Sequence, residues 1–400
     1  MAERRGIFKI FSSGKKERNF SVGIKNNIAA LPTDVDFGVT VNNQAAIKIT
    51  SFYAGLRIIS ENIASLPKQV LKASDSGYEE DHQHAAARVI TQRPNEYMDR
   101  FSFWFCMLAS ILGRGEAFAR IEFDGSKPKA LHFIPAANVK VGLIDGHKMY
   151  QVSGLTGGLA FLNGVYEDWE MLHIMYVTFN GLKGIDPITY NAAAIGRGIA
   201  TQKFSAEYYN KGGHIKAVLE TDNNLDDDSY ENFMKHYNSY GNFGTPLLEY
   251  GIKYKSIGVS PVAAQLIQSE TLSIQDVARI FSLPPHLLAE MSPATFSNIE
   301  QQNIYFAVYS LRPLCKRIEV QLEAKLFDSS ERGKYSVKFD LKGMMRGDDA
   351  SRSKYYKDAV EGGWMTPNEV RDQEEMQRLD GLDKPRRPLN YVEVGEETNN

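Results

Sequence analysis

Two long amphipathic helices, each begun by the same device, most constrain what this chain can fold into. Asp186-Pro187 and Ser260-Pro261 each place a capping side chain before a proline at the first helical position, where a missing N–H costs nothing. Apolar residues follow at helical spacing: Ile188, Ala192, Ile195 and Ile199 in the first helix, and Val262, Leu266, Ile274, Val277 and Phe281 in the second. The pattern predicts two long helices of similar length.

These helices bracket a compact segment of the chain. Gly212-Gly213 ends the first helix, and Leu283-Pro284-Pro285 ends the second. Between them, the residue pattern predicts strands over 215–220, 246–250 and 252–257 and a helix that begins after Asp226. The most economical arrangement is an antiparallel helix pair that carries a small α/β module.

The rest of the chain adds helices and β-hairpins. Ala45–Leu66 has a helical face of Ile49, Phe52, Leu56, Ile59, Ile63 and Leu66, which Pro67 ends, and Arg100–Leu112 predicts a buried helix. Alternating segments from Ala117 to Ile174, with Asp-Gly turns at 124–125 and 145–146, predict hairpins. Further predictions are strands over 69–73 and 334–340; helices over 83–92 and 348–361; a third long helix from a Ser297–Glu300 capping box to Phe327, kinked at Pro313; and a last helix opened by Thr366-Pro367. The class is α+β.

The composition is that of an ordinary soluble globular protein with two or three domains. The chain has 400 residues, of which 43% are hydrophobic and 24% charged, which excludes disordered, collagen-like and disulfide-scaffold classes. The longest apolar stretch, Phe101–Leu112, is too short for a membrane span of about 20 residues. The basic first residues lack the apolar core of a secretory signal. Cys106 and Cys315 fall in apolar helical patterns, which predicts buried free thiols.

The charge balance argues against a protein that grips DNA. The net charge is −3, whereas tight non-specific binding depends on cations that neutralise phosphates. The charge is uneven along the chain: residues 1–20 hold six cations and two anions, and residues 366–400 hold five cations and nine anions. Between Arg279 and Arg312 there is no lysine or arginine, and Glu290 is the only charge in the loop 284–297. A loop along which DNA slides would avoid cations, because each phosphate contact adds friction. The alternative interpretation is a plain surface loop.

No motif for catalysis is present. The sequence has no phosphate-binding loop of the Walker type, no G-x-S-x-G and no H-E-x-x-H, so we expect no catalytic residue, cofactor or metal. His82 and His84 form an H-x-H pair, but no Cys or carboxylate cluster accompanies them, and a surface position at a helix start is favoured. His173 lies in an apolar strand and is interpreted as a hydrogen-bonded core residue.

The acidic run Asp226-Asp227-Asp228 has two interpretations. With Asp222, it could bind a divalent cation for metal-dependent hydrolysis of a nucleic acid. Alternatively, Asp226 caps the helix that follows, and the helix dipole favours the acidic neighbours in its first turn. Capping or a charged interaction surface is the favoured interpretation.

The order of short motifs over residues 45–385 resembles the portal proteins of tailed bacteriophages, in the branch named after HK97. The motifs are Ile63–Pro67, Pro94-Asn95, Gly115–Ile121, Leu131–Val139, Leu172–Ile174, Gly184–Ile188, Phe281–Leu288 and Gly363–Arg371. The chain departs from the family pattern in places: Glu116 stands where Asn is usual, Asp186 stands where Ser is usual, and Gly213-His214-Ile215 replace a common segment that contains proline. Each motif is short, but the order and spacing of the whole set are specific.

The resemblance implies an α+β phage portal fold with wing, two-helix stem, small α/β clip and helical crown, assembled as a ring. It divides the chain into a mobile basic arm (1–43), a wing (44–186), a first stem helix (187–211), a clip (212–258), a second stem helix (259–283), a tunnel loop (284–297), a wing helix and strand (298–345), and a crown with an acidic tail (346–400). The tunnel loop would face DNA through Pro284, Pro285, His286, Glu290, Met291, Ser292, Thr295 and Ser297. The docking surface of the clip would be Asp222, Asp226, Asp227 and Asp228.

The function that the resemblance implies is a ring, usually of twelve subunits, through which double-stranded DNA is packaged and ejected. Its implied partners are the terminase large subunit, the head–tail adaptor and the major capsid protein, with DNA in transit and no membrane. The implied location is the portal vertex of the virion, with assembly in the host cytoplasm. The alternatives are a metal-dependent hydrolase or nuclease and another head–tail connector protein.

Overall fold

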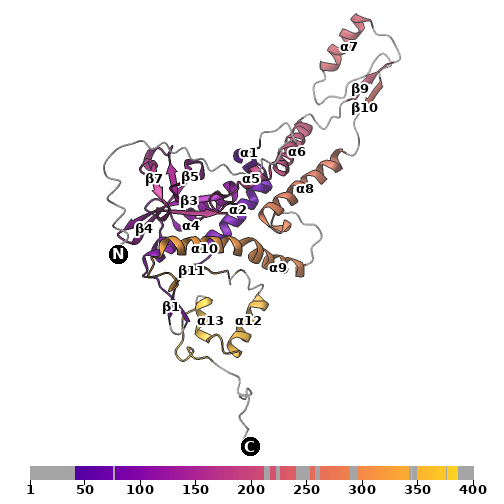
Figure 1. The fold of residues 1–400 in the computed structure, drawn as a ribbon. Helices are drawn as coiled ribbons and strands as arrows, with labels where there is room; N and C mark the ends of the chain where they lie inside the picture. The colour runs from indigo at the N-terminus through magenta and orange to yellow at the C-terminus, as the bar shows by residue number, and fades with distance from the viewer. Residues whose placement is uncertain are drawn as a thin grey trace, which may run out of the picture. The chain divides into compact units, whose positions relative to one another are not determined.

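The computed structural model describes residues 41–74, 77–210, 217–221, 226–239, 253–256, 262–288, 296–341, 344, 349–374 and 376–385 (Figure 1). The contacts within the chain divide it into two compact units. Val70–Gly196 and Arg317–Val337 make up most of the first unit, whereas Ala45–Gln69, Arg197–Lys316 and the chain from Lys338 onward make up the second. Helices and small antiparallel sheets occur in both units, as the predicted α+β class requires.

Two three-stranded antiparallel sheets form the centre of the first unit. Their strand orders are β4 (Lys127–Ile134), β3 (Glu116–Asp124), β8 (Met171–Met175) and β5 (Val139–Ile144), β6 (His147–Val152), β7 (Gly164–Glu167). Asp145 and Gly146, which join β5 to β6, both have positive φ, as a tight two-residue hairpin requires. The predicted hairpins are therefore confirmed.

Side chains from both sheets, together with Leu162, pack into one apolar core. Its fully or nearly fully buried members include Phe118, Ile134, Tyr150, Leu162 and Met171. A second buried set comes from helix α4 (Arg100–Arg114), which Asp99 caps by accepting the Ser102 N–H at 2.8 Å. Cys106 of α4 is half-buried, so the prediction of a buried thiol there was wrong, whereas Cys315 is buried. No helix in the described ranges is both long and apolar enough to cross a bilayer.

Two glycines let the backbone after α4 touch the backbone before the next helix. A Cβ on Gly115 would lie 1.9 Å from the carbonyl oxygen of Ile185, and a Cβ on Gly184 would lie 2.1 Å from the carbonyl oxygen of Gly115. Gly115 also has a φ of +79°, which favours glycine. The Tyr176 N–H donates to the Gly115 carbonyl at 2.8 Å. Only residues without a side chain fit this crossing, which explains both glycines of the motifs.

A third sheet pairs β11 (Tyr335–Phe339) with β1 (Lys68–Ser74) and β2 (Gly77–Glu80). Beside it, His84 caps the short helix α3 (Ala85–Ala87) and points its Nε2 at Glu331 Oε1, 3.1 Å away. A π-helical turn, Arg88–Gln92, follows, so the helix expected over 83–92 is present in part as a π turn. The His84 side chain is only 11% exposed. The helix-start position predicted for His84 is confirmed, but its predicted surface position was wrong, because the ring packs against Phe327 and Tyr335.

The second unit packs helix α2 (Thr50–Ser65) against the helices that follow. All six residues of the predicted face are buried: Ile49, Phe52, Leu56, Ile59, Ile63 and Leu66. The Phe52 and Phe281 rings lie 5.0 Å apart. The helix ends where the Lys68 ammonium donates to the carbonyls of Ile63, Ala64 and Leu66 at 2.9–3.3 Å. A separate short helix, α1 (Asn43–Ile47), precedes it, so the expected single helix is broken near Ile49.

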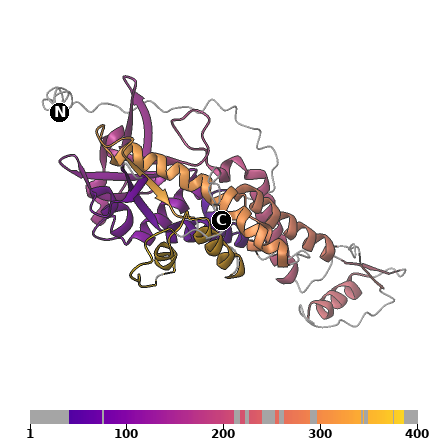
Figure 2. The same ribbon diagram turned by 90° about the horizontal axis from the view of Figure 1, so that it is seen from below.

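Helices α6 (Ala192–Asn210) and α8 (Val262–Phe281) run antiparallel, side by side (Figure 1 and Figure 2). Ser205 donates to Glu270 at 2.9 Å, and Arg197 pairs with Asp276 at 3.2 Å, so rising numbers on one helix meet falling numbers on the other. A Cβ on Gly198 would lie 2.7 Å from Ser273 Oγ, which shows how closely the helices approach. The predicted antiparallel pair is confirmed.

The first of the two predicted helices is interrupted near its start. Asp186 caps a short helix, α5 (Pro187–Tyr190), by accepting the N–H groups of Ile188 and Thr189. Asn191 then leaves helical geometry, and its side-chain amide donates to the Pro187 carbonyl at 2.8 Å. An asparagine side chain that bonds its own backbone competes with the helix. The expectation of one helix from 187 to 210 was therefore wrong at one residue.

The third long helix has three consecutive parts. They are α9 (Phe296–Tyr305), a π-helical turn (Phe306–Leu311) and α10 (Arg312–Leu326). The helix already includes Phe296, so Ser297 lies inside its first turn, and the prediction that Ser297 is the cap was wrong. Pro313 is the second residue of α10, just after the π turn, and the irregularity expected at that proline takes the form of this turn.

The last helices of the chain form a small cluster of their own. Tyr356 and Ala359 of α12 (Asp349–Glu361) pack with Met365 and with Val370 of α13 (Pro367–Gln373). Thr366 and Glu369 form the predicted capping box, each side chain bonding the backbone N–H of the other residue. The predicted capping box and terminal helix are confirmed.

Candidate functional site

The segment predicted to face DNA begins directly after α8. Ser282, with a φ of +55°, ends that helix, and the Leu283 N–H donates back to the Ala278 carbonyl at 2.8 Å. Leu283 is buried, and a Cβ on Gly55 of α2 would lie 3.2 Å from it. The segment therefore leaves α8 from a point anchored on α2.

Only the ends of this segment lie within the described residues. Pro284 is half-buried, and Pro285 and His286 lie in a single 3₁₀ turn, Pro285–Leu288. The described residues offer the buried Nδ1 of His286 no hydrogen-bond partner. Glu290, Met291, Ser292 and Thr295 lie outside the described residues, and Ser297 lies in the first turn of α9. The DNA-facing role of this set stays a prediction.

The acidic run near residue 226 lies at the start of helix α7 (Asp227–Ser239). Asp226 accepts the Ser229 N–H at 3.0 Å, and this hydrogen bonding holds the pKa of the Asp226 carboxyl below its usual value. Asp227 and Asp228 are exposed in the first turn. Asp222 lies outside the described residues. The capping interpretation of Asp226 is therefore confirmed.

The same module contains one pair of antiparallel strands. β9 (Ala217–Glu220) pairs with β10 (Lys253–Ser256), with Glu220 opposite Lys253. The strand expected over 246–250, Gly212-Gly213 and Ser260-Pro261 lie outside the described residues. Within the described part of the chain, no group of three or more His, Cys, Asp and Glu residues is placed to hold a metal ion.

A buried polar network in the first unit was only partly visible in the sequence. Its centre is His173, which is 2% exposed and lies beside Phe118 at a ring separation of 4.3 Å. The Lys148 ammonium lies 3.0 Å from His173 Nδ1, and because an ammonium can only donate, Nδ1 accepts. The ring proton is therefore on Nε2, which donates to Glu116 at 3.2 Å. The predicted hydrogen-bonded core histidine is confirmed.

Burial decides the charge of this histidine. It lowers the pKa of His173 and outweighs the neighbouring Glu116 carboxylate, which acts in the opposite direction. The imidazole is therefore neutral near pH 7, although it contacts a carboxylate. Glu116 also accepts the Gly184 N–H at 3.0 Å, so it links the histidine to the glycine crossing.

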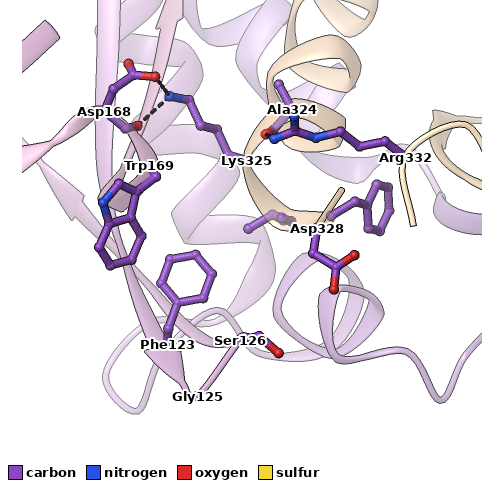
Figure 3. A pocket seen from close by; sticks show the side chains of 11 residues that line it. Phe123, Gly125, Ser126, Asp168, Trp169, Ala324, Lys325, Asp328 and Arg332 are labelled. Carbon is purple, nitrogen blue, oxygen red and sulfur yellow. Dashed lines mark hydrogen bonds and ion pairs between the residues drawn. The ribbon is translucent and has the colours of Figure 1, made fainter. Parts of the chain in front are cut away.

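The network continues to the end of α10. Tyr150 donates to Asp168 at 3.3 Å. The Lys325 ammonium lies 2.5 Å from the other carboxylate oxygen of Asp168 (Figure 3). Lys325 also donates to the Asp168 carbonyl. Sequence reasoning did not single out Lys148, Asp168 or Lys325. One available signal was Glu116, a charged residue directly before the apolar residues Ala117, Phe118 and Ala119 of β3.

Comparison with known proteins gives this fold a class. Residues 50–375 match the family described as phage portal protein. The portal protein of Enterobacteria phage HK97 is 27% identical over 369 residues, which cover 89% of this chain and 85% of the relative. The probable portal protein of Streptomyces phage phiC31 is 29% identical over 384 residues, which cover 90% and 82%.

Solved structures agree on the fold. A chain of the virion of a native gene transfer agent particle matches with a TM-score of 0.59 and 18% identity, covering 84% of this chain and 94% of the other. An HK97-family phage portal protein from Corynebacterium diphtheriae matches with a TM-score of 0.55 and 15% identity, covering 77% and 98%.

The antiparallel helix pair, the small strand module between its helices and the family match define a class of structural protein, the portals. The chain belongs to the phage portal protein family and is of the HK97 type.

Proposed function

We propose that this chain assembles into a ring at one vertex of a phage capsid, through which double-stranded DNA enters and leaves. The observation that carries the proposal is the family match, which covers residues 50–375 and so includes both units. A similar chain, with a TM-score of 0.55 and 17% identity, comes from the neck of a native gene transfer agent particle computed with C12 symmetry. Twelve copies are therefore the expected number.

The parts of the chain take separate roles in this ring. Residues 44–186 and 298–345 form the wing, the helices over 187–211 and 259–283 form the stem, 212–258 form the clip, and 346–400 form the crown with its acidic tail. Residues 1–43 form a basic arm, and 284–297 form the tunnel loop. The antiparallel pairing of α6 with α8 supports the assignment of a two-helix stem.

Portal proteins are structural, and this chain works by geometry rather than by catalysis. The terminase large subunit docks on the clip and supplies the energy for packaging, and the head–tail adaptor replaces it afterwards. The major capsid protein surrounds the ring in the virion, and the ring assembles in the host cytoplasm. The loss of solvent from apolar side chains such as Leu272, which is 43% exposed in one chain, favours assembly.

Two alternatives are weaker. Neither the family match nor the described acidic residues support a metal-dependent hydrolase, since Asp226 acts as a helix cap. The matches cover 85% and 82% of two portal proteins, which favours a portal over another head–tail connector.

The test is the assembly state of the purified full-length chain. Native mass spectrometry is expected to give a species of twelve chains, and negative-stain images are expected to give flanged rings with a central hole. A monomer that persists at micromolar concentration would refute the proposal. Compact particles without a central hole would refute it as well.

A further inference from the structure

A cavity of ≈ 470 Å³ in the first unit has three cations in its wall. Lys148 comes from β6, Lys325 from the end of α10, and Arg332 from the turn before β11. Asp168 is the only carboxylate among the residues that line it. Three cations and one anion leave the wall with a formal charge of +2.

Two of these cations form no ion pair with a carboxylate of the described residues. Lys325 pairs with Asp168 at 2.5 Å, but among the residues that the structure describes, none forms an ion pair with Lys148 or Arg332. Lys148 donates to His173 Nδ1, and Arg332 donates one N–H to the Ala324 carbonyl at 3.0 Å. Both side chains therefore keep donors that the described protein groups leave unused.

The surroundings of Lys148 make its positive charge costly. The residue is half-buried, and burial lowers the pKa of its ammonium. Asp168 in the same wall partly offsets this effect of burial, but it forms its ion pair with Lys325. The direct neighbours His173 and Tyr150 are neutral, and Glu116 lies on the other side of the imidazole, outside the cavity wall. A half-buried charge of this kind is stabilised by an oxyanion that completes its hydrogen bonds.

We propose that this cavity binds a phosphate group, with Lys148 and Arg332 as its charged donors. A phosphate carries about −1.5 to −2 charges at neutral pH and so matches a wall of +2 better than a single carboxylate does. The bound group would join β6 to the turn after α10 and would stabilise the first unit against unfolding.

A second cavity next to the first allows free phosphate to be distinguished from a phosphate ester. A second cavity of ≈ 130 Å³ shares Asp168, Lys325 and Arg332 with the first, and the rings of Phe123 and Trp169 line it (Figure 3). These two rings lie 5.5 Å apart, and Trp169 is 49% exposed. An aromatic wall next to a phosphate site fits a planar base. A nucleoside monophosphate can use both cavities, whereas inorganic phosphate uses one.

The experiment is isothermal titration calorimetry of the full-length protein at constant ionic strength. The ligands are inorganic phosphate, a nucleoside 5′-monophosphate and the same nucleoside without phosphate. Saturable binding of phosphate and of the monophosphate, but not of the nucleoside, is expected. Tighter binding of the monophosphate identifies an ester as the ligand, and equal binding identifies free phosphate. The absence of saturable phosphate binding, or equal binding of the bare nucleoside, overturns the proposal.

Substitutions in the cavity wall test whether phosphate binds there. Lys148→Met and Arg332→Gln each remove one charged donor and are expected to weaken phosphate binding about ten- to hundredfold. Lys140→Met removes an exposed cation of β5 and should bind as the wild type does. Arg332 is exposed, so its variant keeps the core intact if Lys148→Met fails to fold. Wild-type affinity in Arg332→Gln and in a folded Lys148→Met rejects the site.

Discussion

At the residue scale, Glu116 joins two features that look unrelated in the sequence. Its carboxylate accepts the N–H of Gly184, where two backbone segments cross. It also accepts the Nε2–H of His173 in β8, the strand paired with β3. The residue is 6% exposed, so both hydrogen bonds form away from solvent, where unmade bonds are costly. This double role explains how a charged glutamate is accommodated at a buried position at the start of β3.

The buried His173 predicts a pH dependence of stability. Because its pKa is lowered in the folded state, the unfolded chain binds the proton more readily than the folded chain between the two pKa values. The contribution of His173 to the free energy of unfolding is therefore fully present above the ordinary pKa of 6.5 and falls as the pH drops below it. The groups that face the ring are Glu116 from β3, Lys148 and Tyr150 from β6, and, at longer range, Lys325 from α10.

The measurement compares thermal unfolding of the wild type and of His173→Gln between pH 7.5 and 5.5. Glutamine keeps a donor and an acceptor but does not titrate in this range. We expect the wild type to be the more stable protein at pH 7.5 and its advantage to shrink on acidification. An advantage that is constant over the whole range would show that His173 does not titrate on unfolding.

At the element scale, four helix starts in this protein are capped by side chains next to them in the sequence. Asp99, Asp186, Asp226 and Thr366 each accept a backbone N–H from the first turn of the following helix. Such caps satisfy donors that have no partner within the helix. The same chemistry interrupts a helix at Asn191, whose amide bonds to a carbonyl of the preceding turn.

The acidic start of α7 allows capping and docking to be separated. Asp226→Ala removes the acceptor for the Ser229 N–H and is expected to lower the thermal stability of the chain, whereas Asp226→Asn keeps a capping oxygen and is expected to change it little. Asp227→Asn with Asp228→Asn leaves this cap in place and removes two exposed charges. We expect this double variant to bind the head–tail adaptor or terminase more weakly.

The readouts are differential scanning fluorimetry for stability and biolayer interferometry for docking, both on assembled rings. Unchanged docking by Asp227→Asn with Asp228→Asn would remove this surface from the contact with either partner. Equal melting temperatures for Asp226→Ala and Asp226→Asn would contradict the capping role.

At the scale of the whole molecule, the small net charge conceals an uneven distribution. The chain sums to −3, yet its first 20 residues are basic, its last 35 are acidic, and no lysine or arginine occurs between Arg279 and Arg312. A ring that holds DNA tightly would place cations along its channel, because phosphate neutralisation drives binding. If residues 284–297 form the tunnel loop, as we propose, the lack of lysine and arginine there suits a channel through which DNA moves.

This argument predicts the effect of adding charge to the tunnel loop. Glu290→Lys with Ser292→Lys is expected to slow or arrest DNA packaging while rings still form, because new phosphate contacts oppose sliding. Packaging into capsids can be measured by protection of DNA from nuclease. Ser153→Lys, at an exposed position of the first unit, is the control and should package normally. Normal packaging by the loop variant would place the loop outside the DNA path.

The sequence by itself determined the features that depend on neighbouring residues. Caps at Asp186 and Thr366, the Asp145-Gly146 turn and the buried face of α2 all follow from chemistry within a few positions of the chain. The order of short motifs over most of its length was also enough to indicate the portal family, which the match over residues 50–375 shows.

Only the tertiary structure decided which polar residues meet inside the protein. Lys325 reaches Asp168 across 157 positions and His84 reaches Glu331 across 247, and both contacts depend on how elements distant in the sequence pack. The cavity between Lys148 and Arg332 exists for the same reason. Local propensity acts over a few residues, whereas these contacts require the complete packing of the first unit. No local sequence pattern therefore predicts them.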